Sequence, residues 1–382
     1  MDLHRPFQAI LLKRLLEPLP LLQVLLGPRQ VGKTTAATQI FQTWQGAKLM
    51  VSADAPIPLS ADWIRYQWQQ AKNLGEEALL IIDEIQKVPG WSEQIKILFD
   101  AERRKKHLRV LLLGSSSLNL QKGLSESLAG RFELSFAPHW SFAECSAAFG
   151  WDFKTYLKFG GYPGAQPFIG DVERWRQYIL NSIIEPVLGR DILGQVRIDK
   201  PALFRQCFEL IAQYPAQEVS LAKLLGQLQD RGNATTIKYY LNLFEQTYLI
   251  RSLTKYSGSQ LAVRASSPKI LILNNALTHA WTSPLRIDID PVWYGRVFEA
   301  TLGAQLAQIP NSQLFYWREG NAEVDFVLKT GTHIYGIEIK SGVRQTTTRG
   351  LETFSKKYPK AKCLLWAEAE CMAFLTQKMH LE

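Results

Sequence analysis

Cysteine and histidine are scarce in this sequence of 382 residues. The four cysteines form no CxxC pair and the six histidines form no HExxH motif, so zinc ribbons, zincins and disulfide scaffolds have no support. No apolar run approaches the ~20 residues that a membrane-spanning helix needs, and no targeting signal stands at the start. We therefore expect a cytoplasmic protein with free thiols and no membrane partner.

The charge balance is uneven, because 44 Lys and Arg residues face 35 Asp and Glu residues, which gives a net charge of +9. This excess suits a polyanionic partner, but many proteins without such a partner share it, so charge alone leaves the question open. Hydrophobic residues make up 46% and charged residues 21%, which excludes wholesale disorder and fibrous architectures. At roughly 100 to 200 residues per domain, the length predicts about two to four domains.

A glycine-rich segment follows the first apolar strand pattern. Residues 21–34 read as a short strand and then GPRQVGKT, and a helical pattern comes next. In such a loop the backbone N–H groups turn inward around phosphate oxygens, and Gly27 and Gly32 leave room for them. Lys33 would neutralise the β- and γ-phosphates of ATP, and the Thr34 hydroxyl would ligate magnesium. This pattern favours a phosphate-binding loop over a plain turn between a strand and a helix.

Carboxylates follow the second apolar strand pattern, residues 78–82. Ligands bind beyond the carboxyl ends of parallel strands, so Asp83 can reach the metal and Glu84 can orient the attacking water. An acidic pair that caps the next helix is the alternative. A third strand pattern, residues 109–113, leads to Ser115, which would sense the γ-phosphate or would simply form a turn or cap. The expected nucleotide contacts are Gly27, Pro28, Arg29, Gln30, Val31, Gly32, Lys33, Thr34, Thr35, Asp83 and Ser115.

An arginine, Arg131, follows the third strand pattern in the segment SLAGRFE. Its planar guanidinium could stabilise the charge that develops on the transferring phosphoryl group in the site of a neighbouring subunit. Hydrolysis would then depend on assembly, so a homo-oligomer is expected. The alternative is a structural salt bridge to Glu133 or another carboxylate.

These segments carry a family resemblance. GPRQVGKTT, LLIIDEIQKVP, LLLGSSS and SLAGRFEL together resemble the AAA+-type ATPases of bacteria and archaea that are fused to a C-terminal domain of unknown function. PHWSFAE and FGGYPG further along resemble the helical lid of that family, so the resemblance spans essentially the whole chain. This lid has no Gly-x-Arg, which departs from the AAA+ pattern, and Arg190 is a candidate substitute.

Three helical patterns and two strand patterns occupy the middle of the chain. Ser220 and Asn233 are suitable N-caps for the second and third helix. The strands could pair as the wing of a winged helix, and such a fold would lay side chains of its third helix along a DNA major groove. An interdomain brace on the same fold is the alternative. The helices are expected at 202–213, 220–227 and 234–246, the strands at 248–253 and 268–273, and the DNA contacts at Thr235, Thr236, Lys238 and Tyr239.

The last quarter of the chain brings acidic residues onto a predicted antiparallel sheet. If the second hairpin turn centres between Thr330 and Gly331, Asp325 faces Gly336 and is a diagonal neighbour of Glu338 on the same face. The helix of this region is expected at 295–306 and the strands at 314–318, 323–328 and 333–339.

Asp325, followed after twelve residues by Glu338-x-Lys340, resembles the PD-(D/E)xK nuclease constellation, with Glu299 on the preceding helix. The chemistry of these groups would let Asp325 and Glu338 hold magnesium or manganese beside a scissile phosphate of DNA. Lys340 would lower the pKa of the attacking water or stabilise the developing charge. Val324 stands where the motif usually has proline. A salt-bridged surface cluster is the alternative.

We therefore predict an α/β multidomain protein with two possible functions. The first is an ATPase that regulates a metal-dependent nuclease acting on DNA. The second is an ATPase switch or interaction module, toxin-like or stress-related, whose nuclease-like fold binds nucleic acid or protein without cleavage. The expected domains are a P-loop parallel αβα sandwich of the AAA+ type at 1–138, a helical lid at 139–198, a winged helix at 199–273 and a PD-(D/E)xK nuclease-like α/β domain at 274–382.

Overall fold

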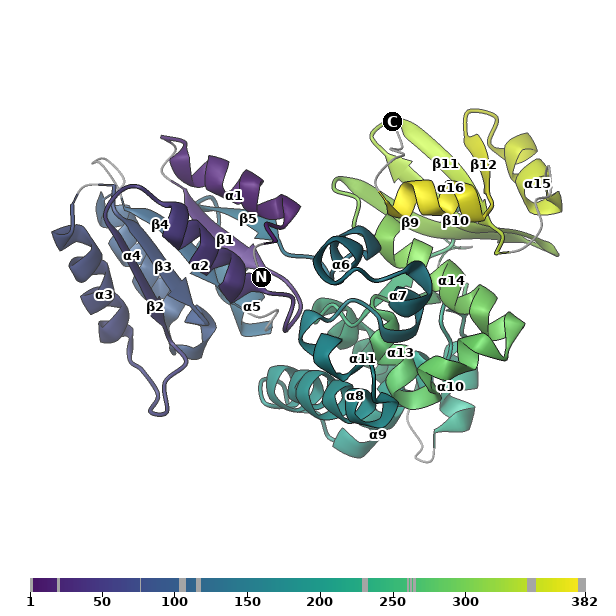
Figure 1. The fold of residues 1–382 in the computed structure, drawn as a ribbon, viewed down its shortest axis with the longest axis horizontal. Helices are drawn as coiled ribbons and strands as arrows, with labels where there is room; N and C mark the ends of the chain where they lie inside the picture. The colour runs from purple at the N-terminus through teal and green to yellow at the C-terminus, as the bar shows by residue number, and fades with distance from the viewer. Residues whose placement is uncertain are drawn as a thin grey trace. The chain divides into compact units, whose positions relative to one another are not determined.

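The computed structural model describes residues 3–18, 21–75, 77–102, 108–114, 118–228, 233–259, 261, 263, 266–341 and 348–376. The chain forms two compact units (Figure 1). The first unit contains Met1–His139 together with Gly189–Val196, and the second unit contains Trp140–Leu188 together with Arg197–Glu382. The first unit thus includes a short segment that is distant from the rest of it in the sequence. The four-domain division stays a prediction.

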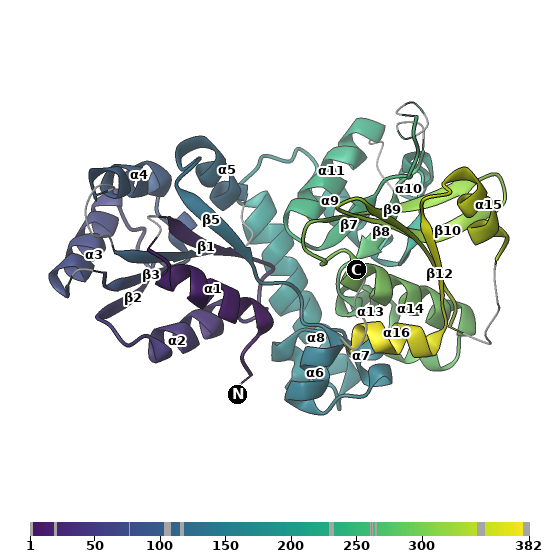
Figure 2. The ribbon, with the colours of Figure 1, turned by 90° about the horizontal axis from the view of Figure 1, so that it is seen from above.

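A five-stranded parallel sheet forms the centre of the first unit, with the strand order β2-β3-β4-β1-β5. Helices α1 and α2 cover one face, and α3, α4 and α5 cover the other (Figure 2). The elements are α1 (Pro6–Leu16), β1 (Leu22–Leu26), α2 (Lys33–Thr43), β2 (Lys48–Ser52), α3 (Ala61–Asn73), β3 (Leu79–Asp83), the short 3-10 helix η1 (Ile85–Lys87), α4 (Trp91–Glu102), β4 (Arg109–Leu113), α5 (Leu118–Ser127) and β5 (Phe132–Phe136).

Three of these strands carry the apolar runs of the sequence. The strands predicted at 21–26, 78–82 and 109–113 are confirmed as β1, β3 and β4, with ends within one residue. Their side chains are buried on both faces because helices cover the sheet on both sides. Ile82 of β3, for example, packs in one cluster with Trp68 of α3. This core fixes the carboxyl ends of β1 and β3 along one edge of the sheet.

Short helices and π-helical turns begin the second unit, where the sequence predicts a lid. π-Helical turns are rare and are often found at functional sites. The last of them, η4, also contributes residues to the first unit. The elements are α6 (Phe142–Phe149), α7 (Phe153–Phe159), η2 (Pro163–Phe168), α8 (Val172–Tyr178), η3 (Ile179–Ile184) and η4 (Pro186–Leu193).

Three helices and a three-stranded antiparallel sheet follow, in the strand order β6-β8-β7. The three predicted helices are confirmed within one residue at each end. Both predicted N-caps are also confirmed, because the Ser220 hydroxyl accepts from Lys223 N and the side-chain Oδ1 of Asn233 accepts from Thr236 N. The elements are α9 (Pro201–Ala212), β6 (Gln217–Glu218), α10 (Leu221–Gln227), α11 (Ala234–Gln246), β7 (Ile250–Leu253) and β8 (Lys269–Ile272).

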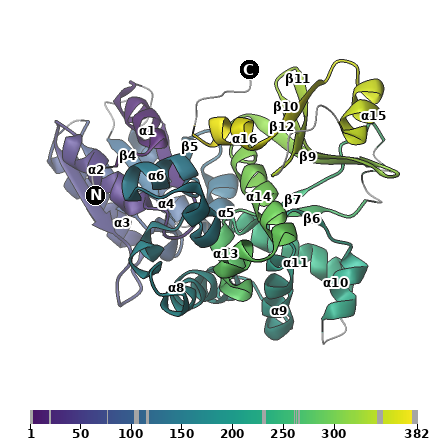
Figure 3. The ribbon, with the colours of Figure 1, turned by 45° about the vertical axis from the view of Figure 1, so that its right-hand side comes forward.

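A four-stranded sheet with the order β12-β11-β10-β9 ends the chain. Helix α15 covers one face of it, and α14 and α16 lie on the other (Figure 3). The helix and the three strands predicted here are confirmed, with longer bounds for all but β11. The elements are α13 (Asn275–Thr282), η5 (Pro284–Asp288), α14 (Pro291–Leu306), β9 (Ser312–Glu319), β10 (Ala322–Thr330), β11 (His333–Ile339), α15 (Arg349–Lys357), β12 (Lys362–Trp366) and α16 (Glu368–Leu375).

The hairpin between β10 and β11 turns one residue later than predicted, so the predicted register is wrong. Val327, and not Asp325, lies opposite Gly336. Gly331 adopts a φ of +55° at the first position of the turn, which a glycine tolerates without steric cost. A later turn moves the pairing by two positions, and the period of a strand is also two. Asp325 and Glu338 therefore keep a common face.

Candidate functional site

The glycine-rich loop runs from the end of β1 to the start of α2. A Cβ on Gly27 would lie 2.2 Å from the carbonyl oxygen of Ala137, so any side chain there would collide with backbone. Gly32 is the N-cap of α2 with a φ of +89°, a left-handed conformation that favours glycine. Both glycines are thus required by the path of the loop, and the loop ends on the N–H groups of a helix, where anions bind.

Lys33 is the first residue of α2, and only 8% of it is exposed. Its ammonium donates hydrogen bonds to the carbonyl oxygens of Gly27 at 3.0 Å and Pro28 at 2.6 Å. Burial lowers the pKa of this ammonium to about 8, although the nearby carboxylates of Glu84 and Asp83 act in the opposite direction. The loop thus holds a cation that its own carbonyl groups solvate only in part.

Thr34 and Asp83 meet where the loop faces the end of β3. The Thr34 hydroxyl donates to Asp83 Oδ2 at 2.7 Å, and Asp83 Oδ1 accepts from the backbone N–H of Glu84 at 2.9 Å. This pair places a hydroxyl oxygen and a carboxylate oxygen side by side, which is the oxygen donor set that magnesium prefers. The residues present therefore fit a magnesium ion held between them.

Glu84 directly follows β3 and has a φ of +53°, a strained conformation for a residue other than glycine. Its Oε2 accepts a hydrogen bond from the Gln86 amide at 2.6 Å. Burial, and then the charge of Asp83, raise the pKa of the Glu84 carboxyl. A carboxylate with a raised pKa beside a metal site is suited to accept a proton from water.

Arg29 makes a contact within the first unit that the sequence does not reveal. Its guanidinium binds both carboxylate oxygens of Asp191, with Nη2 at 2.7 Å from Oδ1. Asp191 is only 4% exposed and lies in the segment Gly189–Val196, which also contains Arg190. The segment is therefore attached to the phosphate loop by a bidentate ion pair.

The other predicted nucleotide contacts have simpler surroundings. Val31 is buried and its carbonyl accepts from Arg5, Gln30 is exposed with a φ of +57°, and Thr35 is exposed in the first turn of α2. Ser115 lies outside the residues that the structure describes.

Three known families match successive parts of the chain. Residues 20–146 match the AAA domain, which covers the loop, Asp83, Glu84 and the whole parallel sheet. The first unit carries an AAA-type P-loop ATPase domain. Residues 150–287 match a domain of unknown function (DUF8612), and residues 294–379 match another (DUF4143).

Similar proteins extend over both units. An uncharacterised protein of Mycobacterium tuberculosis is 29% identical over 364 residues, which is 92% of this chain and 77% of the relative. An uncharacterised protein of Methanocaldococcus jannaschii is 23% identical and covers 80% of this chain and 72% of its own length. A solved Walker-type ATPase of Pyrococcus abyssi is 14% identical with a TM-score of 0.48, over 73% of this chain and 95% of that one.

Arg131 of the AAA domain forms an ion pair within its own chain. Its Nε and Nη2 atoms each lie 2.8 Å from a carboxylate oxygen of Asp100 on α4. This is the structural salt bridge that the sequence offered as the alternative to a catalytic role, although Asp100 and not Glu133 is the partner. The hydrogen bond to Asp100 raises the pKa of the Arg131 guanidinium, so the charge itself is permanent.

The acidic cluster of the second unit contains a lysine that the prediction missed. Lys269, the first residue of β8, is 2% exposed and pairs with the carboxylate of Glu299 on α14. Its ammonium lies 3.9 Å from Asp325 Oδ1 and donates to the Asp325 carbonyl oxygen at 3.2 Å. A single charged residue at the start of the apolar run 269–273 was the available signal.

Glu338 and Lys340 form a second pair in this cluster, with Glu338 Oε1 2.8 Å from the Lys340 ammonium. Asp325 Oδ2 accepts a hydrogen bond from Ile339 N at 2.8 Å. Burial raises the pKa values of Glu299, Asp325 and Glu338, and the charge of Asp325 raises those of both glutamates further. The predicted residues are thus brought together, but each of the three carboxylates already contacts a cation or an N–H group.

A divalent metal does not fit this cluster as it stands. Among the described residues, no group of three His, Cys, Asp or Glu side chains is arranged to hold a metal ion. The predicted ligands are Asp325 and Glu338, but Asp325 Oδ2 accepts from Ile339 N, Asp325 Oδ1 lies 3.9 Å from the Lys269 ammonium, and Glu338 Oε1 pairs with Lys340. A metal would need ~2.0–2.6 Å to each ligand oxygen. A metal shared by Glu299 and Asp325 would meet the Lys269 ammonium, which contacts both carboxylates. No cleavage step is therefore assigned to Asp325, Glu338 and Lys340.

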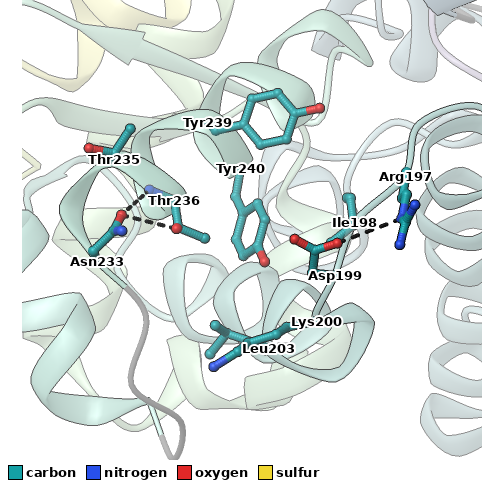
Figure 4. A pocket seen from close by; sticks show the side chains of 10 residues that line it. All are labelled: Arg197, Ile198, Asp199, Lys200, Leu203, Asn233, Thr235, Thr236, Tyr239 and Tyr240. Atoms are coloured by element: carbon teal, nitrogen blue, oxygen red, sulfur yellow. Dashed lines mark hydrogen bonds and ion pairs between the residues drawn. The ribbon is translucent and has the colours of Figure 1, made fainter.

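A pocket of about 520 Å³ lies at the start of α11, in the region predicted to bind DNA (Figure 4). Three of the four residues predicted to contact DNA line this pocket, namely Thr235, Thr236 and Tyr239. The cationic residues Arg197 and Lys200, which precede α9, line it as well. The residues that line the pocket are Arg197, Ile198, Asp199, Lys200, Leu203, Asn233, Thr235, Thr236, Tyr239 and Tyr240.

None of the helices in the described part of the chain has the length and apolar character that a membrane span requires.

Proposed function

We propose that the AAA domain hydrolyses ATP with magnesium and that the second unit contacts DNA without cutting it. The observation that carries the first part is the 2.7 Å contact between the Thr34 hydroxyl and Asp83 beside the buried ammonium of Lys33. A Mg·ATP complex needs these three groups together, because a cation must face the phosphates and oxygens must face the metal.

Each residue has a distinct role in this proposal. The loop N–H groups and Lys33 bind the phosphates, while Thr34 and Asp83 hold the magnesium. A magnesium ion held by these two residues would supply charge neutralisation at the β- and γ-phosphates. Glu84 orients a water molecule and accepts its proton as the water oxygen bonds to the γ-phosphorus and the bond to the β-γ bridging oxygen breaks. ADP and inorganic phosphate leave.

Steady-state ATP turnover tests these roles. Glu84→Gln should keep ATP binding and lower turnover on the order of 100-fold, whereas Lys33→Ala should weaken binding as well. Glu126→Gln and Lys48→Ala are matched controls, because both side chains belong to the AAA domain but lie outside the loop. Unchanged turnover in Lys33→Ala would show that the loop assignment is wrong.

The pocket at the start of α11 supports the second part of the proposal. Arg197 and Lys200 are exposed cations that can neutralise phosphates, and Tyr239 is 45% exposed, so its ring can stack on a base (Figure 4). Asp199 lies 3.8 Å from Arg197 and offsets part of this charge. Surfaces that bind nucleic-acid strands combine cations that contact phosphates with aromatic side chains that stack on bases, and this pocket has both.

Anisotropy of labelled duplex and single-stranded DNA at two salt concentrations tests this surface. Replacing Arg197 and Lys200 together by alanine should weaken binding about tenfold and reduce its salt dependence. Arg174→Ala, an exposed arginine of α8, is the control. If the wild type binds neither DNA while it hydrolyses ATP, the second unit is instead an interaction module for another protein.

A further inference from the structure

We propose that Lys269 is a permanent internal counter-ion that stands where a divalent metal would have to bind between Glu299 and Asp325, so that the nuclease-like centre is metal-independent. The proposal concerns the second unit alone and does not depend on ATP hydrolysis. Its basis is the placement of one ammonium group against two carboxylates inside a folded sheet.

The backbone builds this placement through a β-bulge. The pairing of β10 with β9 shifts between Val324 and Val327, so Asp325 lies in the irregular stretch. A bulge leaves a residue out of the ladder and redirects its groups. The Asp325 carbonyl oxygen accepts instead from the Lys269 ammonium at 3.2 Å. Lys269 itself is fixed by β8, where it pairs with Glu218 of β6 and Leu253 of β7.

The ammonium is enclosed by groups that favour a cation. Among the described residues, it contacts the Glu299 carboxylate, the Asp325 carboxylate and the Asp325 carbonyl oxygen. The ring of Phe326 completes the enclosure, with its centroid 4.8 Å from Nζ, within cation–π range. A side chain that is 2% exposed and contacted in this way has no room to leave without the sheet opening.

A divalent ion would have to compete with this lysine for the same oxygens. Both positive charges would share a space a few ångströms across, where the low dielectric makes their repulsion strong. Burial alone would lower the pKa of Lys269, but Glu299 and Asp325 outweigh that effect and raise it. The contacts with Glu299 and Asp325 thus favour the charged lysine in the space that the metal would need.

Two carboxylate oxygens of the cluster are buried without a hydrogen-bond partner in the described part of the chain, Glu299 Oε1 and Glu338 Oε2. Glu299 Oε1 forms the ion pair with the Lys269 ammonium, so Glu338 Oε2 is the one of the two without that cation. With Lys269 removed, this oxygen and the carboxylates of Glu299 and Asp325 would form an acidic pocket without its cation. Oxygen ligands of this kind suit Mn²⁺ and Mg²⁺.

Mn²⁺ titration of the nucleotide-free full-length protein, followed by electron paramagnetic resonance, tests the proposal. Wild type and Asp325→Asn should bind the same number of Mn²⁺ ions, because no site depends on Asp325. Lys269→Met should gain one bound Mn²⁺, and the double variant Lys269→Met/Asp325→Asn should lose it. Lys340→Met is the control, because it removes a lysine of the same cluster that is 37% exposed.

Two results would overturn the proposal. One is a Mn²⁺ ion that wild type binds and Asp325→Asn does not, which would show that metal and lysine coexist. The other is a Lys269→Met protein that has a native near-ultraviolet circular dichroism spectrum but binds no more Mn²⁺ than the wild type. If Lys269→Met does not fold, the comparison of wild type with Asp325→Asn decides the matter alone.

Discussion

Each unit contains a lysine that is almost completely buried, and the two have opposite surroundings. Lys33 in the phosphate loop contacts two carbonyl oxygens, and burial lowers its pKa to about 8. Lys269 in the second unit contacts two carboxylates, which raise its pKa. The charge of Lys33 is thus compensated only in part by the groups that it contacts, whereas the charge of Lys269 is compensated by two carboxylates.

The difference separates a binding site from a structural ion network. A buried cation with too little compensating charge gains free energy when an anion arrives, so the AAA domain is prepared for phosphates. A buried cation with its counter-ions in place gains nothing from a ligand and loses much if a partner is removed. Burial and charge alone therefore do not identify a functional lysine, whereas the identity of its neighbours does.

Removal of Lys269 should produce the largest effect on stability. Lys269→Met leaves Glu299 and Asp325 without their shared cation and should cost about 3–5 kcal/mol in the free energy of unfolding, measured with urea at pH 8. The matched variant Lys340→Met should cost less than about 1 kcal/mol, because Lys340 is 37% exposed and water screens its pair with Glu338.

The pH dependence of this loss has a definite sign. Without Lys269, the two carboxyls have folded-state pKa values above their unfolded values, so their contribution worsens as pH rises through that interval. The cost of Lys269→Met should therefore be smaller at pH 5 than at pH 8. Equal costs for Lys269→Met and Lys340→Met would contradict the contrast between an enclosed and an exposed ammonium.

ATP affinity should depend on pH through Lys33. The pKa of Lys33 is about 8 without phosphates, and bound phosphates favour the charged form, so binding above pH 8 must take up a proton. The affinity should be constant below pH 8 and should fall by about tenfold per pH unit above it. Isothermal titration calorimetry in buffers of different ionisation enthalpy measures both the affinity for ATP and the number of protons taken up on binding.

Glu84→Gln sharpens this test. The Glu84 carboxylate raises the pKa of Lys33, so its removal should move the inflection to lower pH. An affinity that is flat from pH 7 to pH 9.5 would show that Lys33 is protonated throughout and that the loop carbonyls solvate it fully.

Arg131 should give the smallest effect. Its pair with Asp100 is largely at the surface, where water screens it, so Arg131→Ala and Asp100→Ala should each leave the urea midpoint nearly unchanged and change turnover by less than about twofold. Turnover measured over a range of protein concentrations is the test. A loss above tenfold in Arg131→Ala alone, recovered by mixing with Glu84→Gln protein, would instead place Arg131 in the site of a neighbouring subunit.

The elements around the phosphate loop and two helix caps of the second unit could be predicted because their signals are local. The apolar runs of β1, β3 and β4 and the caps at Ser220 and Asn233 lie within a few residues of the structure they determine. The order strand, loop and helix then places Lys33 and Thr34 without knowledge of any distant contact.

The two most informative contacts could not be predicted because they join distant parts of the chain. Arg29 and Asp191 are 162 positions apart, and Lys269 and Asp325 are 56 apart. The register of β10 with β11 was also predicted wrongly. It depends on which residue begins the turn in the left-handed conformation, and that residue is Gly331. Sequence periodicity gave the shared face of Asp325 and Glu338 but not the cation beside them.

The discontinuous make-up of the first unit has a consequence for protein engineering. A fragment that stops at His139 would lack Gly189–Val196 and with it the only acidic side chain shown to hold Arg29 in the described structure. Such a fragment would contain every residue of the nucleotide motif and would still be an incomplete version of the site. The smallest intact module is thus defined by contacts between separated segments, and a boundary drawn along the sequence would divide it.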